Sequence, residues 1–163
     1  MSEIQSGTGL HFLCGKIASG KSTLAQQLVR ETQAVLLSED TWLATLYPGE
    51  ILQLTDYIEK SRLLKSALEP HLVALLQKGM TLVLDFPANT PVQRRWLKGL
   101  AEQAGCRYCC YVLDVSDEEC KRRLAARNLS GENPFTTSAE QFDLITAHFS
   151  YPSEEEGLVI SRR

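Results

Sequence analysis

The sequence predicts a single α/β domain built on a parallel β-sheet, and three observations indicate this fold class. Short apolar runs alternate with segments of helical periodicity along the 163 residues, as in folds whose parallel strands are joined by helical crossovers. The run TLVLDF at 81–86 is apolar almost throughout, which is typical of a strand covered on both faces. The first apolar run ends at a turn that fits G-x-x-x-x-G-K-[ST].

Hydrophobic spacing and turn residues place the elements of the first half of the chain. A strand is predicted at 10–14, a helix at 22–30 and a second strand at 34–38. A long helical pattern with leucines along one face follows at 55–78. Pro70 lies inside this pattern, so we expect the helix to be kinked or divided there.

The second half of the chain continues the alternation of strands and helices. Ser116 is expected to cap a helix, because Glu119 three residues later completes a capping box. A loop rich in Gly, Asn and Pro begins near Arg127. The expected elements are a strand at 81–86, a helix at 91–104, a strand at 108–115, a helix at 117–127, a helix at 138–149 and a strand at 158–161.

Composition excludes several classes of function. The hydrophobic fraction is 44%, the charged fraction is 23% and the net charge is −3, which is ordinary for a globular domain and unlike a basic nucleic-acid-binding protein. No apolar run approaches the roughly 20 residues that span a bilayer, and the first residues lack the pattern of a signal peptide. We expect a cytoplasmic protein with no nucleic-acid partner and no membrane association.

The turn GKIASGKST after the first strand carries the strongest functional signal. Gly15 and Gly20 allow tight turning with amide groups facing inward, and the following helix adds the positive end of its dipole. Lys21 can reach the β- and γ-phosphates of a nucleotide, and the Ser22 hydroxyl can bind Mg²⁺. The structural alternative is a glycine-rich turn with an exposed lysine. The expected nucleotide-binding residues are Gly15, Ala18, Ser19, Gly20, Lys21, Ser22 and Thr23.

Two acidic residues follow the second strand, at the edge where parallel α/β sheets bind ligands. Phosphoryl transfer to a hydroxyl needs a group that accepts or orients the hydroxyl proton. Asp40 is our candidate for this catalytic role, and Glu39 is the second choice. The alternative is a structural one, in which Ser38 or Asp40 caps a helix that begins at Thr41.

Acidic residues also end the third and fourth strands. Asp85 is expected to bind Mg²⁺ together with Ser22, as a Walker B carboxylate does, and a turn residue before Pro87 is the alternative. Asp114 is expected to be structural, because it lies farther from the phosphates.

Arginines supply the remaining parts of a phosphoryl-transfer site. Arg123 and Arg127 are four residues apart and therefore share one face of a helix. We expect both to stabilise charge on the transferring phosphate from a lid at about 127–137, and a solvated basic face is the alternative. Arg94 and Arg95 begin another helix, where they either contact the acceptor or form surface charge.

Several residues have weaker signals. Trp42 follows Asp40 closely and either lines the acceptor pocket or is a partly buried core residue. Cys106 and Cys109 form a single C-x-x-C with no histidine nearby, and because a structural zinc site needs four ligands, we expect buried thiols. The three histidines show no metal-ligand spacing.

The segments GKIASGKST, SEDTW, VLDF, RRLAARN and FDLITAHFSYPSEEE together resemble the small P-loop ATP-binding proteins of the zeta-toxin and chloramphenicol-phosphotransferase-like kinase group (AAA_33-type domains). The resemblance covers residues 10–156. It implies a three-layer P-loop NTPase sandwich over 1–163, with strand order 2-3-1-4-5 and a small lid as in nucleoside kinases. It also implies ATP·Mg²⁺-dependent phosphorylation of a small acceptor.

The same resemblance supports roles for individual residues. It makes Asp40 the proton acceptor, and it makes Arg123 and Arg127 lid arginines. Polynucleotide-kinase relatives carry an arginine three residues after the catalytic aspartate, where this chain has Leu43, which counts against a phosphorylated polynucleotide end as acceptor.

A small-molecule kinase is therefore the leading hypothesis for function. The chain is short for a motor ATPase, and it lacks the N/T-K-x-D string of a signalling GTPase. The alternative is a nucleotide-binding module without transfer, such as a sensor or a toxin-system component. In either case we expect ATP and Mg²⁺ as ligands and a monomer or homodimer.

Overall fold

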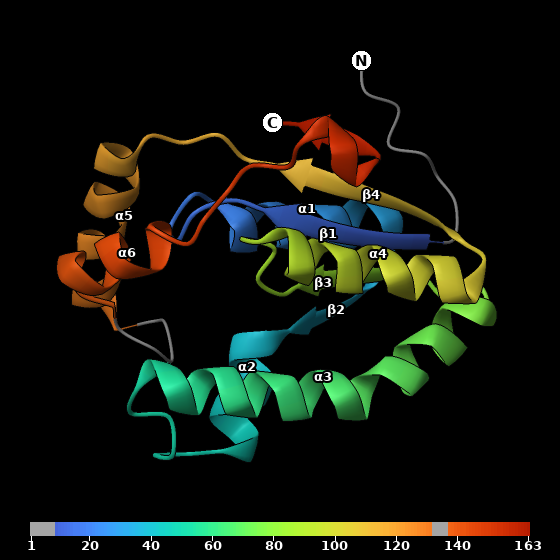
Figure 1. Ribbon diagram of the computed structural model, residues 1–163, viewed down its shortest axis with the longest axis horizontal. Coiled ribbons are helices and arrows are strands. Elements are labelled where there is room, and N and C mark those ends of the chain that lie inside the picture. The colour runs from blue at the N-terminus through green and yellow to red at the C-terminus, as the bar shows by residue number, and fades with distance from the viewer. Residues whose placement is uncertain (1–8, 132–136) are drawn as a thin grey trace.

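The computed structural model describes residues 9–131 and 137–163, which form one five-stranded sheet between helices (Figure 1). Neighbouring strands all run parallel, in the order β2-β3-β1-β4-β5, which confirms the predicted fold class and strand order. The strands are β1 (Gly9–Cys14), β2 (Val35–Ser38), β3 (Leu82–Asp85), β4 (Arg107–Val112) and β5 (Ile160–Arg162).

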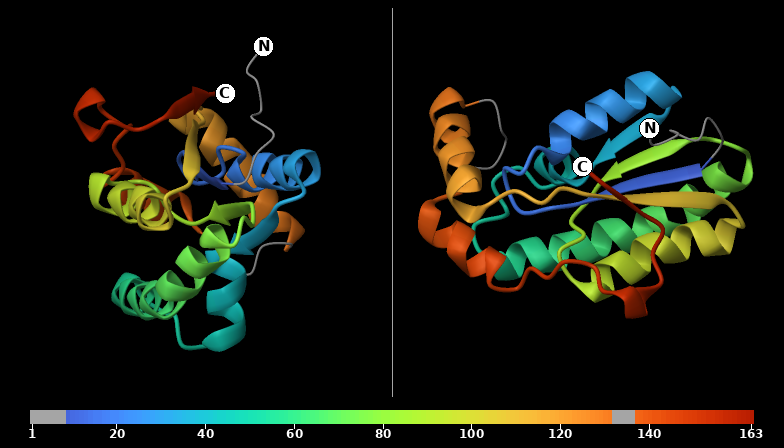
Figure 2. Two further views of the ribbon diagram at one scale, coloured as in Figure 1. Left: turned by 90° about the vertical axis from the view of Figure 1, so that its right-hand side faces the viewer. Right: turned by 90° about the horizontal axis from the view of Figure 1, so that it is seen from above.

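Helices α3 and α4 cover one face of the sheet and α1 covers the other, while α5 and α6 lie beyond the carboxyl ends of the strands (Figures 1 and 2). Among the residues described, no helix has the length and apolar character needed to cross a membrane. The helices are α1 (Lys21–Thr32), α2 (Glu39–Leu46), α3 (Leu54–Gln77), α4 (Pro91–Ala104), α5 (Asp117–Ser130), α6 (Ala139–Thr146) and the 3-10 helix η1 (Glu154–Glu156).

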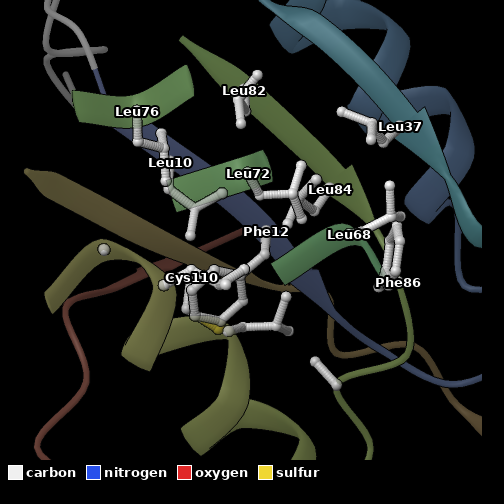
Figure 3. Packing of buried hydrophobic residues seen from close by; sticks show 14 of the residues in the cluster. Leu10, Phe12, Leu37, Leu68, Leu72, Leu76, Leu82, Leu84, Phe86 and Cys110 are labelled. Carbon is white, nitrogen blue, oxygen red and sulfur yellow. The ribbon is translucent and has the colours of Figure 1, made fainter. Parts of the chain in front are cut away.

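The central strand β1 is buried on both faces because alternate side chains enter two separate cores. Leu10 and Phe12 pack with leucines of α3 and β3 in the larger core (Figure 3), whereas Leu13 packs with Ala25 and Leu28 of α1. All six residues of β1 are buried, as expected of a strand with helices on each side. The turn that follows β1 is therefore attached to a strand that is packed on both faces.

Helix α3 passes through Pro70 undivided, so of the two outcomes expected there the division does not occur. Its axis changes direction towards the carboxyl end in Figure 1, as happens where a proline removes one N–H from the helix ladder. Pro70 is exposed, and the helix keeps one buried face on both sides of it. The residues of that face are Ser61, Leu64, Leu68, Leu72 and Leu76.

At the start of α5, only one of the two hydrogen bonds of the predicted capping box forms. Ser116 Oγ accepts from the Glu119 backbone N–H at 3.3 Å. The Glu119 carboxylate does not return to the cap and instead accepts from the guanidinium groups of Arg122 and Arg123. The predicted capping box is therefore half formed, because two neighbouring cations compete for the glutamate.

Helix α5 also continues past Arg127 to Ser130, so the first residues of the expected loop are helical. Gly131, with φ of 69°, follows the last helical residue. Residues 132–136 of that loop lie outside the described part of the chain. The prediction of a lid at about 127–137 therefore remains a prediction.

Candidate active site

The turn between β1 and α1 is a tight loop in which two positions restrict the side chain. A Cβ on Gly15 would lie 2.5 Å from Ser19 Oγ and 3.3 Å from the carbonyl oxygen of Leu113, so a larger residue would force the loop to shift. Gly20, with φ of 102°, lies directly before α1 and adopts a conformation that side chains other than glycine rarely take. This loop therefore has the form that the sequence motif predicts.

Lys21 folds back over this loop. Its Nζ donates to the carbonyl oxygens of Gly15 at 2.7 Å and Lys16 at 2.8 Å. Burial lowers the pKa of the Lys21 ammonium, and the carboxylates of Asp85 and Asp40 act in the opposite direction. The lysine is thus a cation held against a helix N-terminus that already attracts anions.

Ser22, in the first turn of α1, meets Asp85 at the end of β3. Ser22 Oγ donates to Asp85 Oδ2 at 3.0 Å. The register of β2 and β3 pairs Asp85 with Ser38, which places it at the carboxyl edge of the sheet. Hydroxyl and carboxylate oxygens are hard ligands of the kind Mg²⁺ prefers. The pair therefore fits the predicted magnesium site.

Asp40 lies in the first turn of α2, exposed at the surface and close to several charged groups. Desolvation by the surrounding protein, followed by repulsion from Glu39 and Asp85, raises the pKa of Asp40 from its ordinary 3.8 to about 6. Lys21 and Arg127 act in the opposite direction. Asp40 is not the helix cap, because Ser38 Oγ accepts from the Thr41 backbone N–H at 3.4 Å.

Glu39, unlike its exposed neighbour Asp40, is only 1% exposed. Its carboxylate accepts from the hydroxyls of Tyr57 and Ser61 on α3. The second choice for proton acceptor is therefore a carboxylate enclosed between α2 and α3, and Asp40 is the acidic residue of the pair that solvent and ligands can reach.

Arg123 lies at the turn after β1, whereas Arg127 lies within electrostatic reach of Asp40. Arg123 donates to the Ser19 carbonyl oxygen at 3.2 Å and to Glu119 at 2.9 Å, so in this structure it is held on the loop backbone. Arg127 acts on the charge of Asp40, and its buried Nε has no hydrogen-bond partner among the described residues. The roles predicted for the two arginines at the transferring phosphate therefore remain predictions.

Arg94 is neither an acceptor contact nor surface charge, so both predictions for it are wrong. It is 0% exposed and forms a bidentate pair with Glu156 at 2.7 and 3.0 Å. It also donates to the carbonyl oxygens of Ala88 and Ser150, both at 2.8 Å. Its neighbour Arg95 is exposed.

Trp42 is 39% exposed and belongs to none of the hydrophobic cores, so the core alternative is wrong. Residues two apart on a helix point about 200° apart, and Trp42 and Asp40 therefore project from nearly opposite sides of α2. Leu43, at the position where polynucleotide-kinase relatives carry arginine, is buried in the larger core. The role of Trp42 in an acceptor pocket stays a prediction.

One contact at the site was not foreseen from the sequence. Lys16 pairs with Asp117 at 2.7 Å, which joins the loop after β1 to the start of α5. Lys16 Nζ also lies 5.6 Å from the ring centroid of Tyr151, whose hydroxyl donates to Asp114 at 3.0 Å. Asp114 thus has the structural role expected of it. No periodicity could have paired Lys16 with Asp117, because about 100 positions separate them.

The cysteines show no sign of a metal centre within the described residues. All five are free thiols, with Cys106 and Cys109 half-buried. Burial raises the pKa of both thiols. In the ranges 9–131 and 137–163, no three His, Cys, Asp or Glu residues are grouped so that they could hold a metal ion.

A turn with the G-x-x-x-x-G-K-[ST] motif between a buried central strand and a helix, in a parallel sheet of this order, is the mark of a P-loop protein. Comparison with protein families matches residues 10–152 to AAA_33, an AAA domain. The chain therefore belongs to the AAA_33 family of P-loop domains, and membership implies nucleotide binding. A search of curated protein sequences finds no match.

Solved structures share this kinase-like fold at low identity. A candidate kinase from Chloroflexus aurantiacus J-10-fl has a TM-score of 0.76 and 18% identity, covering 97% of this chain and 88% of that one. The Mycobacterium tuberculosis APS kinase CysC, in complex with AMPPNP and APS, has a TM-score of 0.64 and 17% identity, with coverage of 96% and 88%. A gluconokinase from Sinorhizobium meliloti 1021 has a TM-score of 0.62 and 15% identity, with coverage of 97% and 84%. These similarities concern the fold alone.

Proposed function

We propose that the protein is a small-molecule kinase that transfers the γ-phosphate of ATP to a hydroxyl of its acceptor. The observation that carries the proposal is the surroundings of Asp40. An exposed carboxylate with a raised pKa lies within the electrostatic reach of Lys21, Asp85 and Arg127, which come from three other elements. A protein that only binds nucleotide has no need of a proton acceptor at this place.

The residues divide the reaction among them. The acceptor hydroxyl gives its proton to Asp40, and its oxygen forms a bond to the γ-phosphorus while the bond to the β–γ bridging oxygen breaks and ADP leaves. Lys21 and the amides of the loop hold the phosphates. Ser22 and Asp85 would hold Mg²⁺, which supplies positive charge beside the phosphates when bound.

The lid is part of the proposal. Asn128 donates to the Thr137 carbonyl oxygen at 2.6 Å and accepts from the Thr137 backbone N–H at 3.4 Å, which fastens the end of α5 to the start of α6. We infer that these helices move as one unit and carry Arg127 over the γ-phosphate. Arg123 would then exchange the Ser19 carbonyl oxygen for a phosphate oxygen.

Labelled ATP and a panel of hydroxyl compounds test the function. The panel holds sugars, amino sugars, nucleosides and antibiotics, and label on one class of acceptor supports the kinase. A sugar kinase and a gluconokinase are among the solved structures that share the fold, which makes sugars a sensible first class. Tight binding of ATP with no label on any acceptor would instead support a nucleotide-binding module.

Two variants separate binding from transfer. Asp40→Asn should abolish transfer and keep ATP binding, whereas Lys21→Ala should weaken binding or transfer because the cation of the loop is lost. Tyr108→Phe is the control. It removes a hydroxyl that is hydrogen-bonded to the backbone of Gly157 and Val159, far from the loop after β1. Unchanged turnover in Asp40→Asn would sink the proposed role of Asp40.

A further inference from the structure

Glu39 is fixed at both carboxylate oxygens, directly beside Asp40. Oε1 accepts from the Tyr57 hydroxyl, and Oε2 accepts from the Ser61 hydroxyl at 2.7 Å. Tyr57 and Ser61 are four residues apart on α3 and therefore lie on one face of that helix. Two bonds from a single helix thus hold the first residue of α2.

This arrangement is more than is needed to fasten two helices. Burying a carboxylate costs several kcal/mol before its partners compensate, and apolar side chains often join elements at least as well. Lys65 lies one turn beyond Ser61 on α3. Burial lowers the pKa of Lys65, and the carboxylate of Glu39 acts in the opposite direction. A buried, charged tether next to an exposed acid therefore points to a role beyond packing.

We propose that Glu39, held by Tyr57 and Ser61, is a positioning residue for Asp40. The cap that should fix the start of α2 is weak, because Ser38 Oγ lies 3.4 Å from the Thr41 nitrogen. The two hydrogen bonds that Tyr57 and Ser61 donate to Glu39, here called the Glu39 tether, constrain the start of α2 where the cap does not. It fixes the backbone from which the next side chain, Asp40, projects. The inference rests on the proposed function only for the proton-accepting role of Asp40.

Glu39 also contributes charge to the surroundings of Asp40. Together with desolvation and a second carboxylate it favours the protonated form, and two cations oppose this effect. Tyr57 lies within the field of both acids. The groups that face Asp40 from the surrounding elements are Glu39 on α2, Asp85 on β3, Lys21 on α1, Arg127 on α5 and Tyr57 on α3.

The test compares three variants by two independent measurements. Glu39→Leu removes both bonds, Tyr57→Phe removes one bond and keeps the ring, and Glu39→Gln keeps an oxygen that can accept. The first measurement is NMR of the Asp40 backbone amide and carboxyl carbon in the protein without nucleotide. The second is transfer to the acceptor found in the panel, with kcat and KM for ATP determined separately. Tyr108→Phe is the matched control for loss of a tyrosine hydroxyl.

We expect Glu39→Leu and Tyr57→Phe to shift and broaden the Asp40 resonances while the amides of residues 15–20 keep theirs. Displacement of a reacting group by about 1 Å can lower the rate about 100-fold, so kcat should fall about 10- to 100-fold with KM for ATP unchanged. Glu39→Gln should recover most of kcat. If Glu39→Leu does not fold, Tyr57→Phe and Ser61→Ala give the same readouts.

Two results would overturn the inference: Asp40 resonances that stay as in the wild type in every tether variant, or losses of kcat in Tyr108→Phe equal to those in Tyr57→Phe. Failure of the proposed function looks different, because the wild-type protein would then label no acceptor. In that case the Asp40 resonances still decide whether the tether positions this residue.

Discussion

At the scale of single residues, the pKa of Asp40 is set by charged neighbours whose effects oppose one another. Desolvation and two carboxylates raise its pKa to about 6, although two cations act against them. A general base works best when its pKa lies near the operating pH. The environment therefore makes this aspartate a better proton acceptor near neutrality than an ordinary one.

Transfer should depend on pH through this group. Asp40 accepts a proton only when ionised, so kcat/KM should be steady above its pKa of about 6 and fall about tenfold for each pH unit below it. Steady-state rates between pH 5 and 8 with the acceptor found in the panel measure the profile. A rate that is constant from pH 5 to 7 would contradict the role of Asp40.

Replacing Asp40 should also stabilise the fold. Because its folded-state pKa is raised from 3.8 to about 6, the ionised form opposes folding above pH 6, and this penalty disappears as the pH falls towards 4. Asp40→Asn should therefore have a higher Tm than the wild type at pH 8 and nearly the same Tm at pH 4. Thermal denaturation at both pH values measures this, with Glu59→Gln, at an exposed position of α3, as control. An equal difference at both pH values would show that charge is not the cause.

At the scale of elements, close contacts at Gly15 restrict the conformation of the loop between β1 and α1. Gly15→Ala would bring a methyl group within 2.5 Å of Ser19 Oγ and 3.3 Å of the Leu113 carbonyl oxygen. We expect Gly15→Ala to weaken ATP binding at least about tenfold, since the loop must shift to make room. Isothermal titration calorimetry measures this affinity.

The double variant Gly15→Ala, Ser19→Ala identifies the atoms responsible. It removes the nearest atom but leaves the Leu113 carbonyl oxygen, so it should recover part of the affinity and not all of it. Full recovery would mean that the backbone contact is unimportant. No recovery would mean that the Ser19 hydroxyl is unimportant.

Gly99 in α4 is the opposite case within the same fold. It lies inside a helix, and a Cβ built on it meets no atom within 4 Å. Glycine inside a helix is less favourable than alanine by about 0.5–1 kcal/mol, so Gly99→Ala should raise the free energy of unfolding by that amount. Urea denaturation measures it, and a loss of stability would contradict the expectation.

On the scale of the whole molecule, Arg94 joins segments that are far apart in the sequence. From α4 its buried guanidinium reaches Ala88 after β3 and both Ser150 and Glu156 before β5. It thereby holds the segment 150–156 against the loop that follows Asp85.

Removing this link should be costly. Arg94→Met leaves a half-buried carboxylate and two carbonyl oxygens without their donor, and breaking a buried pair costs about 3–5 kcal/mol. Arg94→Lys should recover little, since an ammonium cannot reproduce the bidentate contact. Urea denaturation measures both variants, and a loss of less than 1 kcal/mol in Arg94→Met would contradict this prediction.

The pH dependence of stability gives an independent check. The Arg94 guanidinium lowers the pKa of Glu156 below its ordinary 4.5, so the pair contributes stability above that value and loses it as the pH falls. The wild type should therefore lose more stability than Arg94→Met between pH 6 and pH 3.

The alternation of strands, the loop after β1 and the ends of α4 could all be predicted, because each depends on residues close together in sequence. Arg94 could not be placed, since its burial depends on a glutamate 62 positions away. Asp40 could be ranked above Glu39, but the burial of Glu39 could not be predicted, because it depends on where α2 begins and on Tyr57 and Ser61 of α3. Trp42 was uncertain for the same reason: its side of the helix follows from that starting point.

The central position of β1 has a consequence for how the protein is made. β1 is synthesised before both of its neighbours, and β3 and β4 begin about 70 and about 90 residues later. At about 5–20 residues per second, the ribosome completes those strands about 4 to 20 seconds after β1. Until β3 is complete, both edges of this apolar strand lack their partners, and one edge still lacks its partner until β4 is complete. An unpaired strand edge is a template for pairing with another chain, so the nascent protein is exposed to aggregation until β4 has been made.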